Sequence, residues 1–177
     1  RPYAGVGMTR PSGQQAGRPI RTSADYLASG NKIAAGGLRE ALERAGLRDG
    51  MTLSTHHHLR NGDFIANQVI DLAAEMGVRD LRWVPSASFP CHGEMIKHLE
   101  SGVLHHIEGS MNGPLGAHAS EGKMRGLGVL RSHGGRWQAI QDGEVHIDIA
   151  VIAAPTADAF GNANAVRGPS ACGSQEP

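Results

Sequence analysis

Short apolar segments alternate along the chain with segments whose apolar residues recur every three or four positions. The second pattern runs from residue 38 to residue 45 and predicts a helix that Gly46 can end. Residues 65–76 repeat it, which predicts a helix with Asp63 as N-cap and Gly77 at its C-terminal stop. Further expected elements are a short helix at 94–100 and strands at 51–55, 81–84, 103–107, 129–132 and 147–153.

Helices between successive strands indicate an α/β fold with a largely parallel sheet flanked by helices, because parallel strands need long crossover connections. The segment 147–153 is almost entirely apolar, which predicts a strand covered on both faces. Sheets of this kind bind ligands beyond the carboxyl ends of their strands. The loops that directly follow the strands are therefore the candidate functional segments.

Composition excludes several classes of protein. The 177 residues are 40% apolar and 19% charged, and 17 basic side chains balance 17 acidic ones. Zero net charge argues against a nucleic-acid partner, and the longest apolar run, residues 149–154, is too short to cross a bilayer about 30 Å thick. Two cysteines without a CxxC motif favour a reducing cytoplasm. We expect a cytoplasmic domain over residues 31–177, preceded by an Arg- and Pro-rich leader or linker over residues 1–30.

The most unusual loop follows the first expected strand and holds three consecutive histidines, an arginine and an asparagine. These residues are His56, His57, His58, Arg60 and Asn61. The loop leads into a helix, whose first backbone N–H groups and dipole attract anions. It therefore predicts recognition of a carboxylate or a thioester carbonyl, while one or two histidines could instead satisfy buried backbone groups. No metal site is expected, because adjacent residues at a strand end point to opposite faces and a metal needs converging ligands.

Two later loops carry weaker signals for anion binding. The segment Ser132, His133, Gly134, Gly135, Arg136 follows the fourth expected strand. Its glycines can expose backbone N–H groups beside Ser and Arg donors, although a simple Gly-rich turn explains it equally well. The segment 155–164 includes Asn162 and Asn164, which suit carboxylate or amide recognition as well as a structural turn.

Two other loops lack a recognisable catalytic pattern. Cys91 and His92 are neighbours in sequence, but catalytic Cys and His are usually brought together by the fold, so an inert thiol is the favoured interpretation. The segment 109–116 matches neither GxGxxG nor GxxxxGK[ST], so neither a dinucleotide site nor a P-loop is supported.

Several motifs occur in a fixed order between residues 30 and 174. They are Asp49-Gly50-Met51-Thr52, the loop 56–63, Ser132-His133-Gly134-Gly135-Arg136, the segment 142–148, Phe160-Gly161-Asn162-Ala163-Asn164 and Cys172-Gly173-Ser174. Together they resemble the alpha subunit of bacterial citrate lyase, a citrate CoA-transferase of the CoA-transferase superfamily. Several matching blocks in order are far more specific than any one of them alone.

The resemblance implies an activity and its partners. The family exchanges acetyl for citrate on an acyl-carrier thioester, which releases acetate and leaves a citryl thioester that a β subunit cleaves to oxaloacetate. A small γ subunit carries the thioester on a CoA-derived prosthetic group, and acetyl-CoA can replace it. The expected partners are citrate, acetyl-CoA or acetyl acyl-carrier protein, and the β and γ subunits of a lyase complex. No cofactor is expected on this chain itself.

The resemblance also suggests roles for individual residues. Attack of a carboxylate on a thioester builds negative charge on the carbonyl oxygen, which fixed donors stabilise. We expect His57, Arg60 and Asn61 to be catalytic and His56 and His58 to contact citrate. The proposed second anion site consists of Ser132, His133, Gly134 and Gly135, and Asn162 and Asn164 would orient the acyl group.

Members of this family are much longer, and the superfamily places its active site between two similar halves. The chain is therefore expected to be a first half, with the second half on a missing C-terminal segment or another chain. Two alternatives remain open. One is a sugar-phosphate isomerase on a related fold with Asp148, Asp158 or Glu121 as acid/base, and the other is a non-catalytic module that binds an acyl-carrier protein or a metal.

Overall fold

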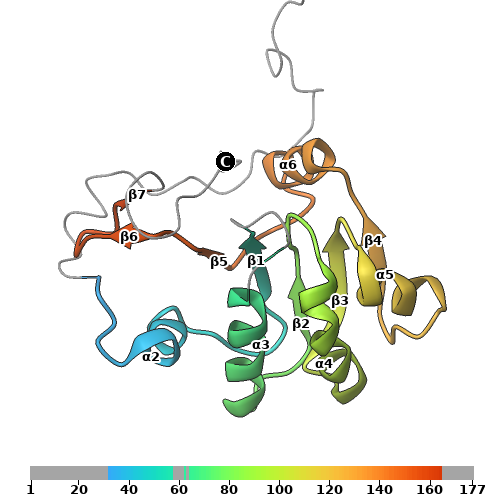
Figure 1. Ribbon diagram of the computed structural model, residues 1–177, viewed down its shortest axis with the longest axis horizontal. Coiled ribbons are helices and arrows are strands. Elements are labelled where there is room, and N and C mark those ends of the chain that lie inside the picture. Colours follow the sequence, from blue (N-terminus) through green and yellow to red (C-terminus); the bar gives the residue numbers. More distant parts are fainter. Residues whose placement is uncertain (1–31, 58–61, 63, 165–177) are drawn as a thin grey trace, which may run out of the picture.

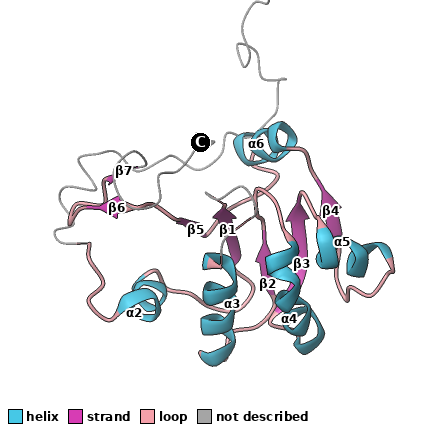
Figure 2. Ribbon diagram, in the orientation of Figure 1, coloured by secondary structure: helices cyan, strands magenta, loops and turns pink. Residues whose placement is uncertain are grey.

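The computed structural model describes residues 32–57, 62 and 64–164. These residues form a central sheet with helices on both faces (Figures 1 and 2). The elements in chain order are α2 (Gly37–Arg44), β1 (Thr52–His56), α3 (Ile65–Glu75), β2 (Leu81–Trp83), the 3-10 helix η1 (Pro90–Met95), α4 (Ile96–Ser101), β3 (Leu104–Gly109), α5 (Gly113–Ser120), β4 (Gly128–Leu130), α6 (His133–Gln141), β5 (Ile149–Ile152), β6 (Thr156–Ala157) and β7 (Ala163–Asn164).

The central sheet has the strand order β4-β3-β2-β1-β5, and every neighbouring pair is parallel. The predicted α/β class with a parallel sheet is therefore confirmed. Because the strands are parallel, their carboxyl ends all meet at one edge of the sheet. A separate antiparallel hairpin, β6–β7, follows β5.

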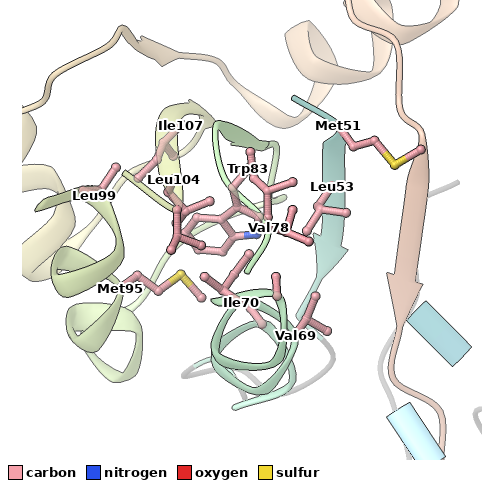
Figure 3. Close-up of a cluster of buried hydrophobic side chains, with 14 of the residues drawn as sticks. Met51, Leu53, Val69, Ile70, Val78, Trp83, Met95, Leu99, Leu104 and Ile107 are labelled. Atoms are coloured by element: carbon pink, nitrogen blue, oxygen red, sulfur yellow. The ribbon is translucent and has the colours of Figure 1, made fainter. Parts of the chain in front are cut away.

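One face of the sheet is apolar and lies under α3, α4 and α5 (Figure 1). Its centre is Trp83, which is fully buried and surrounded by Ile70, Met95, Leu99 and Leu104 (Figure 3). The same cluster includes Leu53 of β1, Ile107 of β3 and Leu115 of α5. Burial of these side chains is the main force that holds the three helices on this face.

The opposite face carries α6. Val84 follows Trp83 directly, so its side chain points away from the apolar cluster, and it packs with Ala139 and Val145. Arg136 of α6 is buried against the same face and donates hydrogen bonds to Ser54 Oγ and to the Val84 carbonyl. These contacts fix the start of α6 over β1 and β2.

The strand predicted at residues 147–153 is confirmed as β5, but it is less buried than expected. The structure places β5 at the edge of the described sheet, where Ile149 is buried and Ile152 is 61% exposed. An apolar run reports hydrophobicity, but the order of strands in a sheet depends on how distant segments pair. The prediction of a strand covered on both faces is therefore not met within the described residues.

Two helices were not predicted, and one predicted cap differs. The segments that begin α5 and α6 contain Gly113, Gly134 and Gly135. Glycine has a low helix propensity and adds no apolar side chain to a periodic pattern, so these helices were not predicted from the sequence. The N-cap position of α3 is Phe64, which makes no side-chain cap hydrogen bond, and Asp63 lies outside the described residues. No helix within the described ranges is long and apolar enough to span a membrane.

Candidate functional site at the carboxyl edge of the sheet

The loop after β2 continues the sheet beyond the end of the strand. Ser86 N–H donates to the Thr55 carbonyl at 3.0 Å, and Ser88 N–H donates to the Ser110 carbonyl at 2.8 Å. Ala87 and Ser110 form a parallel bridge between these two contacts. The loop is therefore bonded to β1 on one side and to the end of β3 on the other, which makes it a rigid floor for the carboxyl edge.

His57 lies on this floor directly after β1. Its Nδ1 atom is 2.8 Å from Ser86 Oγ, and its backbone N–H donates to the same oxygen at 3.4 Å. The ring stacks on His56 with centroids 5.2 Å apart and packs against Phe89 in an edge-to-face arrangement with centroids 4.6 Å apart. The structure therefore brings two predicted site residues, His56 and His57, together with two that the sequence reading did not single out.

Gly62 approaches this floor from the far end of the histidine loop. Its φ of +84° is a left-handed conformation, and a Cβ there would lie 2.8 Å from Cys91 Sγ and 2.9 Å from Phe89. Only glycine fits both constraints without a shift. Gly62, shortly before α3, therefore lies directly against Phe89 and Cys91.

Cys91 and His92 have separate surroundings. His92 is buried, accepts a hydrogen bond from Phe89 N–H at 3.0 Å and packs against the edge of Trp83. The Cys91 carbonyl accepts from Asn67 Nδ2 at 2.9 Å. His92 therefore supports the floor of the edge.

The segment after β4 is the start of a helix and not a Gly-rich turn. Ser132 is the N-cap of α6, and its Oγ accepts from Gly135 N–H at 3.0 Å. That bond satisfies one of the N–H groups expected to bind an anion, while Arg136 points into the opposite face of the sheet. Gly135 N–H and Arg136 therefore have partners within the chain, and the anion site expected at this segment stays a prediction. His133 and Gly134 remain exposed at the helix start.

The histidine loop and the start of α6 lie at the same edge of the sheet. Two strands, β2 and β3, separate β1 from β4, so the strand ends are about 14 Å apart at the usual strand spacing. Both segments therefore lie at one edge of the sheet, which is compatible with a shared site.

The two asparagines after β5 belong to the β6–β7 hairpin. Asn162 donates from its backbone to Asp158 Oδ1 at 2.9 Å and from its side chain to Asp158 Oδ2 at 2.8 Å. These bonds, led by that of the side chain, lower the pKa of the Asp158 carboxyl. The Asn164 carbonyl accepts from Thr156 Oγ1 at 3.3 Å. Of the two interpretations of this segment, the structural turn accounts for the observed bonds of Asn162.

The carboxylates considered for an isomerase are engaged in separate places. Asp148 accepts from Thr52 N–H at 2.9 Å and lies 3.3 Å from His146, whereas the exposed Glu121 pairs with Lys123. Asp158 holds the hairpin turn. No metal-binding group of three His, Cys, Asp or Glu side chains occurs among the residues that the structure describes. His58, Arg60 and Asn61 lie outside those residues, so their roles remain predictions.

A buried ionic cluster on the face under α6 was not predicted from the sequence. Glu108 of β3 is 3% exposed and pairs with Arg131, which follows β4, and with His106 Nε2 at 3.1 Å. Burial raises the pKa of the Glu108 carboxyl, but the hydrogen bonds from Arg131 and His106 outweigh it and hold that pKa below its usual value. An isolated Glu and His two residues apart in a strand share a face, which was the one available signal.

A parallel sheet with helices on both faces defines an α/β domain, the class in which ligands generally bind beyond the carboxyl ends of the strands. Comparison with known proteins then identifies the family. The model of the family "Citrate lyase, alpha subunit (CitF)" matches residues 30–176, so the chain belongs to the citrate lyase alpha subunit family.

Individual relatives agree with this assignment. The citrate lyase alpha chains of Klebsiella pneumoniae and Escherichia coli K12 are 45% and 42% identical over 138 residues, which is 77% of this chain and 27% of each relative. A crystal structure described as an alpha subunit of citrate lyase from Streptococcus mutans, in complex with citrate, superposes with a TM-score of 0.80 at 39% identity. That match covers 99% of this chain and 33% of the solved chain. The chain therefore spans about a quarter to a third of the length of these relatives.

Proposed function

We propose that this chain supplies part of the citrate CoA-transferase site of a citrate lyase complex. In this proposal it binds citrate and an acetyl thioester at the carboxyl edge of the sheet and exchanges acetyl for citrate on the thioester. The thioester would be carried by a CoA-derived prosthetic group on a partner acyl-carrier subunit, or by CoA itself. The observation that carries the proposal is the family match through residues 30–176, supported by the citrate complex of the Streptococcus mutans relative.

The exchange needs two acyl transfers. A citrate carboxylate oxygen attacks the acetyl carbonyl and the C–S bond breaks. The products are a thiolate and a mixed anhydride of acetate and citrate. The thiolate then attacks the citryl carbonyl of that anhydride, which forms the citryl thioester and releases acetate. Each attack places negative charge on a carbonyl oxygen, so donors fixed near that oxygen lower both barriers.

The described residues offer such donors at two points of the edge. His57 is held in one orientation by Ser86, His56 and Phe89. The exposed first turn of α6, with His133 and Gly134, provides the positive end of a helix dipole for a carboxylate. In the proposal, the acyl carbonyl lies near His57 and a citrate carboxylate lies toward α6, with Arg60 and Asn61 completing the site.

The decisive experiment uses this segment joined to its natural downstream sequence. Acetate release from acetyl-CoA plus citrate would be assayed for the wild type, for Arg60→Ala and for Arg48→Ala as a control. Arg48 is an exposed arginine before β1 whose side chain donates a hydrogen bond to the Gly46 carbonyl. We expect Arg60→Ala to lose at least about tenfold in rate, because a charged hydrogen bond contributes roughly 1.5–3 kcal/mol, and Arg48→Ala to retain wild-type turnover.

Calorimetry on the same protein separates the alternatives. Heat from citrate and acetyl-CoA supports the transferase, and heat from a sugar phosphate alone supports an isomerase. Binding of zinc or an acyl-carrier protein without citrate or acetyl-CoA would support the non-catalytic module. Wild-type turnover of Arg60→Ala would remove Arg60 from the site and leave the family assignment unchanged.

A further inference from the structure

Ser86 is a buried hydroxyl at the carboxyl edge that no sequence motif pointed to. Ser86 is only 2% exposed. Its Oγ contacts two atoms of His57, the backbone nitrogen and Nδ1. Ser86 itself is fixed by its backbone N–H bond to the Thr55 carbonyl of β1. The position of the hydroxyl relative to the imidazole is therefore set by the sheet and not by a flexible loop.

The hydrogen of this hydroxyl determines where His57 carries its proton. Toward the backbone N–H of His57, Ser86 Oγ is an acceptor. Within the described residues His57 Nδ1 is the one acceptor near the hydroxyl, at 2.8 Å. If Nδ1 were protonated and donated to Ser86, the hydroxyl hydrogen would be buried without a partner, which is unfavourable. The favourable arrangement has Ser86 donating to Nδ1.

We propose that Ser86 is a positioning residue that holds His57 as the neutral tautomer with its proton on Nε2. His57 then donates a hydrogen bond from Nε2 to a substrate carbonyl or carboxylate oxygen and does not serve as a general base. This inference rests on the proposed function for the identity of that substrate oxygen. The tautomer assignment itself rests on the Ser86–His57 geometry.

The aromatic neighbours of His57 restrict the ring in the remaining direction. His56 stacks on one side with an interplanar angle of 12°, and Phe89 meets the ring at 66°. Rotation of the imidazole about its Cβ–Cγ bond would break both contacts as well as the bond to Ser86. The Nε2–H direction is therefore preorganised, which is what stabilisation of a developing oxyanion requires.

A neutral donor suits the proposed acyl transfer better than a base. The attacking citrate group is a carboxylate and has no proton to remove, while each transfer accumulates charge on a carbonyl oxygen. A proton on Nδ1 would displace the serine hydrogen from its acceptor, so the bond favours the tautomer that carries its proton on Nε2 and fixes the orientation of the ring.

The test compares Ser86→Ala with Ser88→Ala in the full-length chain. Ser88 is an equally buried serine two residues away, whose Oγ bonds to the backbone of Asn112 and not to His57. Nitrogen-15 spectra of the histidine rings, with His57→Gln used for assignment, report which nitrogen of His57 bears the proton. We expect Nε2–H in the wild type and in Ser88→Ala, and a mixture with Nδ1–H in Ser86→Ala.

Turnover measurements add a functional readout. We expect Ser86→Ala to lower kcat about tenfold with KM changed less than about twofold, because a preorganised donor acts chiefly on the transition state. Ser88→Ala should stay within about twofold of the wild type. In the His57→Gln variant, the glutamine amide nitrogen lies near the position of ring Nε2. In that variant Ser86→Ala should lower kcat by less than about twofold, since Ser86 and His57 act as a unit.

Two results would overturn the positioning role. One is an Nδ1–H tautomer in the wild type, and the other is an equal loss of kcat from Ser86→Ala in both backgrounds. An inactive wild-type chain that still shows Nε2–H on His57 would count against the proposed function, while it would support the tautomer assignment. The spectra do not depend on citrate or on turnover, so failures of the two proposals are distinguishable.

Discussion

The face of the sheet under α3, α4 and α5 buries mainly apolar side chains, whereas the face under α6 buries hydrogen-bonded polar and charged ones beside the small apolar cluster of Val84, Ala139 and Val145. On β1 the contrast falls on adjacent residues, since Leu53 joins the apolar cluster and Ser54 accepts a hydrogen bond from Arg136. On β3, Ile107 and Glu108 repeat it. Alternation along each strand therefore separates two kinds of interior within one sheet.

The two faces of the sheet are stabilised in different ways. Apolar burial is non-directional, so the stability contributed by the face under α3, α4 and α5 depends on how well side-chain volume fills the space. The second face depends on particular pairs, because a buried charge that loses its partner is costly. We expect substitutions on the first face to respond to side-chain size, and those on the second to respond to charge.

The largest effect is expected at Trp83. Trp83→Ala should lower the free energy of unfolding by about 3–5 kcal/mol, because it empties the centre of the apolar cluster. Trp83→Phe, which keeps most of the ring but loses the Nε1–H bond to Thr55 Oγ1, should cost less than half as much. Urea denaturation followed by circular dichroism measures both. Equal losses in the two variants would show that the hydrogen bond outweighs volume on this face.

The next effect is expected at Arg131. Arg131→Ala leaves the Glu108 carboxylate buried with His106 beside it but without the arginine charge, and we expect the free energy of unfolding to fall by about 2–3 kcal/mol. The double variant Arg131→Ala/Glu108→Gln should recover part of that loss, because it removes the unpaired charge. Denaturation of the wild type, both single variants and the double variant completes the cycle. A double variant less stable than Arg131→Ala would contradict the charge argument.

The apolar face was predictable from sequence and the polar face was not. Periodicity located β1, β2, β3 and the helix 65–75, because apolar spacing is a local signal. Arg131 is 23 residues from its partner Glu108 and Arg136 is 82 residues from its partner Ser54, and no local pattern encodes such pairs. The same reason explains why His57 was singled out from the sequence and Ser86, 29 residues further on, was not.

A smaller effect is expected from the pH dependence of His106. Burial holds the pKa of the His106 ring below its ordinary value of 6.5 despite its bond to Glu108, and the nearby Arg82 charge acts in the same direction. The unfolded chain therefore binds a proton more readily, so the protein should lose stability as the pH falls below about 6.5. His106→Gln should weaken this dependence by about 1 kcal/mol or less between pH 7 and pH 5.5.

Urea midpoints at several pH values, compared between the wild type and His106→Gln, measure this difference. The lowered pKa of Glu108 adds a second loss only below its ordinary value of 4.5, as the carboxyl becomes protonated and its bond with Arg131 weakens. His146→Gln serves as the control, since His146 is exposed and pairs with Asp148 outside the cluster. Parallel curves for the wild type and His106→Gln above pH 5.5 would contradict the burial argument.

The smallest effects compare two helical glycines on opposite faces. A Cβ at Gly116 of α5 would lie 2.8 Å from the Met111 carbonyl oxygen, whereas a Cβ at Gly134 of α6 would meet nothing within 4 Å. Neither residue has a positive φ, so alanine improves helix propensity by up to about 1 kcal/mol at both positions. We expect Gly134→Ala to raise the thermal midpoint and Gly116→Ala to lower it, because the close approach of α5 outweighs its propensity gain. A gain at both positions would mean that α5 can move away from the loop after β3, and that the first face is packed less tightly than its apolar burial indicates.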